Sequence, residues 1–267
     1  MINNLNFILP EIFISISIML LLILGVFKKK SFNLVHYLSI LVLLSVAILI
    51  FNNPNKSNIF LFGESYIIDK LASFMKILIV SVGAIILLMS KRYLKSLQIF
   101  LIEYPILVLC SILGMMVMIS SNDLIVFYLG LELQSLSLYV LASFNRDQLK
   151  SSESGLKYFV LSALSSGLLL YGCSLIYGFT GSTNFIIINQ MLVSTNQIHT
   201  FGLVFILVGL AFKISAVPFH MWAPDVYEGS PTSVTLFFAI VPKVAALTVF
   251  IRFLYVPFIN IIDQWQI

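Results

Sequence analysis

The sequence predicts an all-α polytopic membrane protein with about eight transmembrane helices. The first observation is composition: of 267 residues, 60% are hydrophobic and only 10% are charged, and the mean hydropathy is +1.06. A soluble domain carries about 25% charged residues and at most about half apolar residues. The second observation is a series of continuous apolar runs, each close to the ~20 residues that a helix needs to cross the hydrocarbon core. Such runs exclude a β-barrel, whose strands are short and alternate in hydropathy.

Eight apolar stretches are long enough to form transmembrane helices. They take up about two thirds of the chain and leave no room for a soluble catalytic domain. We therefore exclude a nucleotide-binding fold, a disulfide scaffold and a nucleic-acid-binding protein, and we expect the lipid bilayer as a partner. The predicted spans are 7–27, 33–52, 69–90, 99–120, 123–144, 154–179, 201–221 and 232–255.

Lysine and arginine residues are concentrated in the loops on one side of the predicted bundle. Short loops rich in these residues mark the cytoplasmic or matrix side of a membrane. Eight lie on this side and three on the other, so the N-terminus is predicted outside, and the even number of spans brings the C-terminus outside as well. The basic loops hold Lys28, Lys29, Lys30, Lys91, Arg92, Lys95, Arg146 and Lys150, and the other side holds Lys56, Lys70 and Arg252.

The loop 180–200 is the only long one between predicted spans. Its apolar residues Phe185, Ile188, Met191 and Leu192 recur at helical spacing. This pattern predicts a short helix lying on the outer membrane interface.

Charged side chains inside the predicted spans are the most informative residues of the sequence. Glu132, Lys213 and Lys243 all lie near the middle of their spans. Each costs about 2.5–3.5 kcal/mol on insertion scales, and such residues usually line an ion or proton path. The alternative is an ion pair that locks two helices together, with the third charge facing a polar gap. Lys76 lies nearer the end of its span and is expected to extend to the outer interface.

Prolines accompany two of these lysines. Pro218 follows Lys213 by five residues, and Pro242 immediately precedes Lys243. Each proline deprives the carbonyl four residues earlier of its helical partner. Within a membrane such a carbonyl needs water or another side chain, and transporters build ion sites at broken helices of this kind.

Several other polar residues allow both a structural and a functional interpretation. Glu153 and Lys157 form an i,i+4 pair typical of a solvated helix start, and His220 is a candidate either for an interfacial hydrogen bond or for proton transfer. Trp222 and Tyr227 suit the membrane interface. Small hydroxyl residues in one helix commonly serve close packing, as in Ser162, Ser165 and Ser166.

Sequence motifs for other chemistry are missing. The sequence contains no phosphate-binding loop, dinucleotide fingerprint, CxxC, HExxH or nucleophile elbow. His36, His199 and His220 have unrelated spacings, so no metal site is predicted.

Three segments resemble one known family. They are LGMMVMISSNDLIVFYLGLELQSLSLYVLASF (113–144), ESGLKYFVLSALSSGLLLYG (153–172) and GLAFKISAVPFHMWAPDVYEGSPTSVT (209–235). They are similar to the antiporter-like subunit N, or chain 2, of proton-translocating NADH:quinone oxidoreductase, respiratory complex I. The resemblance covers essentially the whole chain, and ELQSLSLY and WAPDVYEGSPT are its most specific strings.

The resemblance implies roles for individual residues. Glu132 and Lys213 would form an ion pair between spans five and seven, and Lys243 would be the central proton-relay lysine. Span seven would be a helix broken around Pro218. Glu153, Lys157 and His220 would play supporting parts along the hydrophilic axis.

The resemblance also implies a domain organisation. Residues 1–98 would supply three N-terminal transmembrane helices, and 99–267 the first antiporter-like five-helix repeat. The family has about fourteen spans in two such repeats, so the chain corresponds to an N-terminal half, either of a split subunit or as a truncated copy. A separate chain would then supply the second repeat.

The function implied is proton translocation coupled to quinone reduction elsewhere in the complex. This chain would carry no redox site and no cofactor, while NAD, FMN, iron–sulfur clusters and quinone would bind to other subunits. The location would be an energy-transducing inner membrane, bacterial or mitochondrial. Two alternatives stay open: an Mrp-type cation/proton antiporter subunit, and a structural half-subunit without transport of its own.

Overall fold

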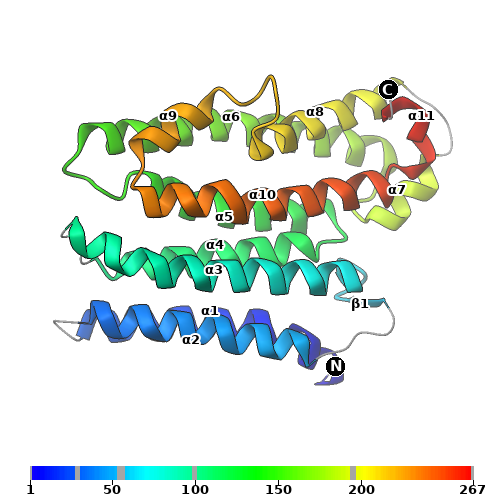
Figure 1. Ribbon diagram of the computed structural model, residues 1–267. Coiled ribbons are helices and arrows are strands. Elements are labelled where there is room, and N and C mark those ends of the chain that lie inside the picture. The colour runs from blue at the N-terminus through cyan, green and yellow to red at the C-terminus, as the bar shows by residue number, and fades with distance from the viewer. Residues whose placement is uncertain (1, 28–30, 53–57, 98–100, 193–196, 266–267) are drawn as a thin grey trace.

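The computed structural model describes residues 2–27, 31–52, 58–97, 101–192 and 197–265. Its helices run side by side in antiparallel fashion, and both chain ends lie at the same end of the bundle (Figure 1). Six described helices are long and apolar enough to cross a membrane, and the shorter apolar helices Glu103–Ile119 and Thr200–Ile214 lie at the two remaining predicted spans. The predicted all-α membrane fold is therefore confirmed. Lys28, Lys29, Lys30 and Lys56, used above for topology, lie outside the described residues.

Every predicted span corresponds to one long helix, although the bounds differ by several residues at some ends. The long helices are α1 (Ile2–Phe27), α2 (Phe32–Phe51), α3 (Lys70–Ser96), α4 (Glu103–Ile119), α5 (Leu124–Ala142), α6 (Leu149–Thr180), α8 (Gln197–Ile214) and α10 (Thr232–Tyr255). The short ones are α7 (Phe185–Met191), α9 (Trp222–Gly229), the 3₁₀-helix η1 (Ile259–Ile261) and α11 (Ile262–Trp265).

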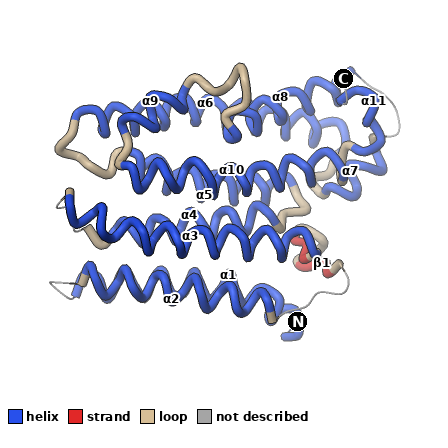
Figure 2. The backbone as a smooth tube through the Cα atoms, viewed as in Figure 1, coloured by secondary structure: helices blue, strands red, loops and turns tan. Residues whose placement is uncertain are grey.

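A small antiparallel hairpin interrupts the helical pattern where the sequence predicts only a loop (Figure 2). Strands β1 (Ile59–Leu61) and β2 (Tyr66–Ile68) pair with Leu61 opposite Tyr66. Side-chain amides of Asn122 and Asn184 both donate to the Glu64 carbonyl, at 2.7 and 3.2 Å, and fix the hairpin to two other loops. The predicted helix in 180–200 is also confirmed, as α7. We call this end of the bundle the hairpin end, and the opposite end, where α3 ends and α6 begins, the basic end.

Helix α4 packs closely against α5 because glycines face each other across the contact. A Cβ added to Gly114 would lie 2.5 Å from the Gln134 nitrogen, and one added to Gly130 would lie 2.8 Å from the Met118 nitrogen. Both neighbours are backbone atoms, which cannot move aside as a side chain can. Small residues at this crossing therefore set the position of α5 and of the polar residues it carries.

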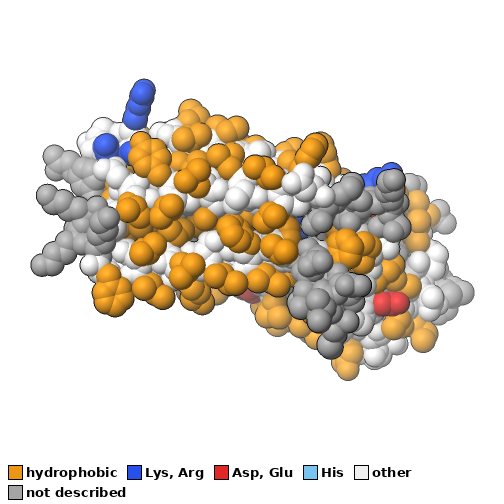
Figure 3. Space-filling model, turned by 90° about the horizontal axis from the view of Figure 1, so that it is seen from below, with side chains coloured by type: hydrophobic (Ala, Val, Ile, Leu, Met, Phe, Trp, Pro, Cys, Tyr) orange, Lys and Arg blue, Asp and Glu red, His pale blue; other side chains and the backbone are white. Residues whose placement is uncertain are grey.

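The outer faces of the helices are apolar. Figure 3 shows hydrophobic side chains spread over the face on the side of α1 and α2. In a soluble protein such a surface would be a large exposed patch, whereas in a bilayer it faces hydrocarbon. On α1 the exposed residues include Ile16, Met19, Leu20, Ile23, Val26 and Phe27.

Span seven is interrupted, but earlier than its predicted end at residue 221. Helix α8 stops at Ile214, and Ser215 takes a left-handed backbone conformation with φ of 64°. The chain then turns through 215–221 and resumes as α9 before α10 begins. Pro218 lies in this turn. A proline has no N–H to donate to the carbonyl four residues earlier, so it does not continue the helix. Pro242, by contrast, is accommodated within the continuous helix α10.

Candidate functional site

Lys213 lies in the last turn of α8, immediately before the helix ends. Its side chain is directed into the bundle, and the residue is only 7% exposed. The ammonium Nζ donates hydrogen bonds to Ser135 Oγ on α5 at 2.8 Å and to Ser162 Oγ on α6 at 2.5 Å. Three helices therefore converge on one buried ammonium group.

The end of α8 supplies electrostatic stabilisation for this charge. The last carbonyls of a helix lack intrahelical partners and carry the negative end of the helix dipole. A cation in the last turn is stabilised by this field, and the effect is larger where water is excluded. The break after Ile214 therefore favours an ammonium at Lys213 without an acidic side chain in contact with it.

Ser162 connects Lys213 to a tyrosine. The Tyr139 hydroxyl on α5 donates to Ser162 Oγ at 2.8 Å, so one serine oxygen accepts from both residues. Two other serines of the predicted hydroxyl patch donate to backbone carbonyls: Ser165 to that of Gly209 and Ser166 to that of Ala163. The packing interpretation fits these two serines, but Ser162 binds the lysine.

The expected Glu132–Lys213 ion pair is not formed in the arrangement that the described residues show, and the pair stays a prediction. The ion pairs among the described residues do not include this one, and Glu132 Oε1 is buried without a hydrogen-bond partner. The reason lies in the position of Ser135, which follows Glu132 by three residues and occupies the same face of α5 one turn further on. The ammonium is held at that turn by two hydroxyls and is not held at Glu132.

Lys243 lies about halfway along α10, one residue after Pro242. Its Nζ lies 5.4 Å from the centre of the Tyr227 ring, which belongs to α9. A cation at this distance is attracted by the ring face. The Tyr227 hydroxyl is buried without a partner among the described residues. The structure thus places α9, the segment after the break, against the second mid-span lysine.

A row of aromatic rings connects the surroundings of the two lysines. Lys213 Nζ lies 5.8 Å from the Tyr139 ring centre, and Tyr139 meets Tyr158 edge to face at 5.0 Å. Tyr158 stacks on Trp222 at 4.7 Å, and Trp222 meets the Tyr227 ring at 6.0 Å. Tyr227 in turn underlies Lys243.

Trp222 lies inside the bundle, so the prediction that it lies at the membrane interface is wrong. It is 4% exposed and stacks between Tyr158 and Phe212. Its indole nitrogen donates to the Phe212 carbonyl at 3.0 Å, and this carbonyl also accepts from the Ser215 N–H at 3.1 Å where α8 ends. Tyr227 is likewise half-buried under Lys243. The sequence alone could not reveal this, because aromatic residues near a span end usually mark the interface.

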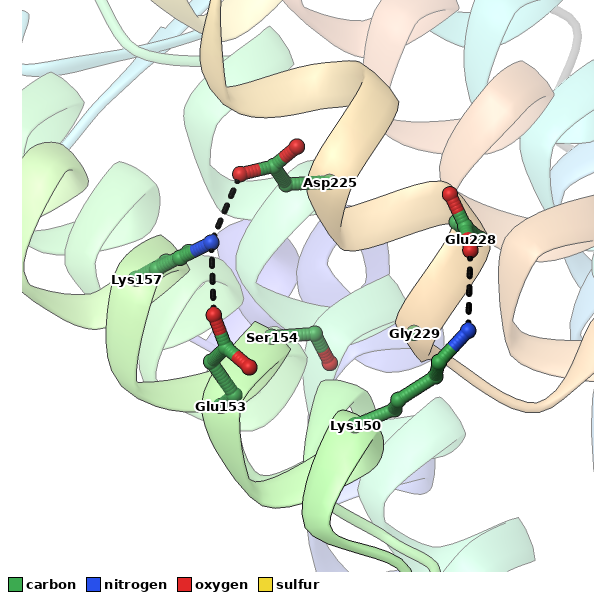
Figure 4. Close-up of a pocket in the computed structure, with 7 residues that line it drawn as sticks. All are labelled: Lys150, Glu153, Ser154, Lys157, Asp225, Glu228 and Gly229. Atoms are coloured by element: carbon green, nitrogen blue, oxygen red, sulfur yellow. Dashed lines mark hydrogen bonds and ion pairs between the residues drawn. The ribbon is translucent and has the colours of Figure 1, made fainter.

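Acidic and basic side chains meet at the basic end around an open cavity of about 140 Å³. Lys157 Nζ bonds to Glu153 at 2.7 Å, which confirms the predicted i,i+4 pair, and also to Asp225 of α9 at 2.8 Å. Lys150 pairs with Glu228 at 3.1 Å. Figure 4 shows the carboxylates of α9 facing the lysines of α6 across this cavity.

This cluster and the Lys213 site share helix α6. Ser162 follows Lys157 by five residues, which corresponds to ~7.5 Å along the helix axis. His220, the remaining supporting residue of the prediction, lies in the turn 215–221, and its side chain is exposed.

Lys76 does not extend to the interface, so that prediction is wrong. It is 4% exposed, and its Nζ forms an ion pair with Glu11 at 2.6 Å. Glu11 is a residue that the sequence interpretation missed, although it lies within the predicted first span and its charge was visible there. Arg252 was counted in an outer loop but is buried in α10, where it pairs with Asp69 at 2.8 Å.

The described residues contain no group of three or more histidine, cysteine or acidic side chains suited to hold a metal ion. The side chains described at the site carry ammonium, hydroxyl and carboxyl groups, which bind and exchange protons.

The fold and the site define a class of protein: a polytopic membrane protein with a lysine buried at the end of a broken helix and a second, partly buried lysine halfway along the next long helix. Residues 121–267 match the model of the family described as NADH:quinone oxidoreductase/Mrp antiporter, transmembrane. The match covers more than half of the chain, and the chain belongs to this family.

Two relatives are NADH-quinone oxidoreductase subunits N. The protein of Pelagibacter ubique is 76% identical over 264 residues, covering 99% of this chain and 56% of the relative. The protein of Maricaulis maris is 50% identical over 267 residues, covering 99% of this chain and 55% of the relative. The chain thus spans about half the length of the curated relatives it matches.

Solved structures agree with the fold. A chain of respiratory complex I from Thermus thermophilus with bound aureothin superimposes with a TM-score of 0.79 at 30% identity, covering 91% of this chain and 52% of that one. A chain of the Mrp complex from Dietzia sp. DQ12-45-1b gives 0.78 at 22% identity, covering 95% and 49%. The second likeness concerns the fold alone.

Proposed function

We propose that this chain contributes to proton translocation as a membrane subunit of NADH:quinone oxidoreductase, coupled to quinone reduction elsewhere in the complex. The names of its relatives and the likeness to complex I support this assignment. The observation that carries it is the buried ammonium of Lys213, held by two serine hydroxyls at the end of a broken helix. A charge placed at that depth is costly, and intramembrane residues of this kind usually mark ion or proton pathways.

The proposed relay begins at Lys213. An ammonium only donates hydrogen bonds, whereas a serine or tyrosine hydroxyl both donates and accepts. A proton leaving Lys213 can therefore bind Ser162 Oγ while the proton of that hydroxyl moves to the Tyr139 oxygen, once Tyr139 has turned to accept it, and the Tyr139 proton passes to water. We assign the arrangement with Lys213 on the serines to the open state of a Glu132–Lys213 pair, and movement of the ammonium by about one helical turn, ~5.4 Å, would close it.

Lys243 is the proposed next carrier, reached through water in the polar space between α9 and α10. Glu153, Lys157 and His220 support the relay from the basic end. Energy would come from subunits that bind NAD, FMN, iron–sulfur clusters and quinone.

The proposed setting is an energy-transducing inner membrane, bacterial or mitochondrial, with the N-terminus outside. The hairpin end would then face outward and the basic end inward. Residues 1–98 and 99–267 are proposed as an N-terminal three-helix unit and a five-helix repeat. Other membrane subunits are the expected partners, one of them supplying a second repeat.

The test is alanine replacement of Lys213 or Glu132 in the assembled complex. We expect proton pumping per NADH oxidised to fall while the amount of complex stays near that of the unmodified protein. Lys70→Ala, which removes an exposed lysine at the start of α3, is the matched control. Normal pumping in both Lys213 and Glu132 variants would leave the two residues a purely structural role.

A second candidate is a subunit of an Mrp-type cation/proton antiporter, which the family description also covers. Co-purification of the chain with NADH–quinone reductase activity separates the two. A third candidate, a structural subunit without transport, predicts that every variant of the mid-span charges alters assembly alone.

A further inference from the structure

Three titratable side chains form a closed hydrogen-bonded ring near the hairpin end, apart from the Lys213 site. Glu11 Oε1 on α1 accepts from Lys76 Nζ on α3 at 2.6 Å and from the Tyr66 hydroxyl on β2 at 2.8 Å. Lys76 Nζ also donates to the Tyr66 hydroxyl at 2.9 Å. Glu11 and Tyr66 are each 6% exposed and Lys76 is 4% exposed. We call these three residues the Glu11 triad.

The triad leaves one strong acceptor unused. Glu11 Oε2 is buried and has no hydrogen-bond partner among the described residues. An unpaired buried acceptor is costly, so this oxygen favours a partner such as a water molecule or a proton. This free oxygen marks the place where a further proton can bind.

A small cavity adjoins the triad. Glu11, Ser73 and Lys76 line it together with apolar side chains, and its volume is about 20 Å³. A cavity of this size holds one water molecule, provided that polar groups surround it. Carboxylate, ammonium and hydroxyl groups meet that condition.

The charged and titratable groups around the triad are few. On α3, Asp69 lies two turns before Lys76, and Arg252 of α10 holds its carboxylate at 2.8 and 2.9 Å. On α2 the cavity wall is Ile50, and the titratable His36 lies fourteen positions away, ~21 Å along the helix. Burial raises the pKa of Tyr66 to about 12, so its hydroxyl stays protonated at neutral pH. Lys76 already carries its proton as an ammonium in the ion pair with Glu11, so a further proton can bind only at Glu11.

We propose that the Glu11 triad is a second proton-binding site, separate from the Lys213 relay and placed at the hairpin end. In the resting state Glu11 is a carboxylate, Lys76 an ammonium and Tyr66 a phenol, with zero net charge. A proton from water binds Glu11 Oε2 and gives a carboxylic acid and a net charge of +1. The two hydrogen bonds to Oε1 are kept, and release returns the proton to water. As a step in proton translocation, the site rests on the function proposed above.

Two variants distinguish a proton-binding site from a contact that only holds α1 against α3. Both are studied in the assembled complex with the full-length subunit. Glu11→Gln keeps the size of the side chain and an acceptor oxygen but cannot take up a proton. The double variant Glu11→Leu/Lys76→Met removes both charges and leaves neither buried alone, so assembly should survive. Ser15→Ala, which removes a local hydrogen bond on α1, is the control.

The first measurement is infrared difference spectroscopy between acidic and alkaline pH. We expect a protonated-carboxyl signal in the unmodified complex, one component of which is lost in Glu11→Gln and kept in Ser15→Ala. A spectrum unchanged in Glu11→Gln overturns the proposal. This result is independent of pumping, and it decides the matter even if the double variant does not assemble.

The second measurement is proton pumping per NADH oxidised. We expect the double variant to assemble and its pumping to fall at least about threefold, as for loss of an intramembrane proton carrier. If the double variant assembles and pumps normally, the triad only holds the helices together, and its proposed role in transport is overturned. Lys213→Ala is measured in parallel: normal pumping there contradicts the function proposed above, while the infrared result still reports whether Glu11 binds a proton.

Discussion

The Lys213 ammonium and the Ser162 hydroxyl are joined by a hydrogen bond of 2.5 Å across the contact between α8 and α6. A hydrogen bond to a charged group contributes about 1.5–3 kcal/mol, roughly twice the neutral case. Because Ser162 also accepts from Tyr139, this one oxygen links the lysine to the aromatic rings between the two mid-span lysines.

Ser162→Ala is predicted to lower proton pumping by about tenfold, because the loss of ~1.5 kcal/mol at the relay lysine corresponds to a factor of ten. The measurement is pumping in membrane vesicles, normalised to the amount of assembled complex. Ser174→Ala, on the same helix but bonded only to the Tyr171 carbonyl, should pump normally. Equal effects of the two substitutions would contradict a specific role for Ser162.

Tyr227→Leu is predicted to impair pumping more than Tyr227→Phe. The ring face below Lys243 stabilises the ammonium by ~0.5–2 kcal/mol, and phenylalanine retains a ring whereas leucine does not. Pumping rates of the two variants, measured at equal complex content, provide the comparison. If Tyr227→Phe lowered pumping as much as Tyr227→Leu, the effect would come from the buried hydroxyl and not from the ring face.

Trp222→Phe is predicted to destabilise the complex by about 0.5–1.5 kcal/mol, because the Phe212 carbonyl loses its indole donor and keeps only the hydrogen bond from the Ser215 N–H. Thermal unfolding of the purified complex should show a lower transition temperature. Trp265→Phe removes the same kind of bond, to the Phe258 carbonyl, far from the helix break. It should leave pumping unchanged, and a pumping defect there would point to a general effect of losing a tryptophan.

Gly130→Leu is predicted to prevent assembly. Even a Cβ at this position would lie 2.8 Å from the Met118 nitrogen, so α4 and α5 would have to separate. Gly167→Ala is the matched control, since a Cβ there meets no atom within 4 Å, and alanine should favour the helix by about 0.5–1 kcal/mol. Blue-native electrophoresis of membrane extracts gives the amount of complex in each case.

Asp225→Asn is predicted to lower the thermal stability of the complex at low salt and to have little effect on it at high salt. The Lys157 ion pairs are largely exposed, and salt screens such pairs. Thermal unfolding at two ionic strengths measures the difference. A loss of stability that persists at high salt would mean that α9 depends on this contact more than its exposure suggests.

The helices were predictable because apolar runs of the right length define them. Pro218 pointed to the broken span, whereas Pro242, which carried the same signal in the sequence, lies within a continuous helix. The partners of the charges were not predictable in the same way. Lys213 binds Ser135 and Ser162, which lie 78 and 51 positions away in sequence. Nothing in the local pattern distinguishes Ser162 from Ser165, since both are small hydroxyl residues of one helix.

The misplaced residues share one cause. Lys76 and Arg252 lie near span ends, where a long basic side chain usually extends to the interface, and only the fold reveals that Glu11 and Asp69 meet them inside. Trp222 was misjudged for the same reason. Position along a span indicates depth, but it does not indicate which direction a side chain takes.

The early end of α8 has a consequence for engineering. The field that favours the Lys213 ammonium originates in peptide groups, so no exchange of side chains along α8 removes it while the backbone keeps its shape. Restoring a continuous helix through residues 215–221, for instance by replacing Ser215 and Pro218 with alanine, would take this field away while leaving every charged residue in the sequence.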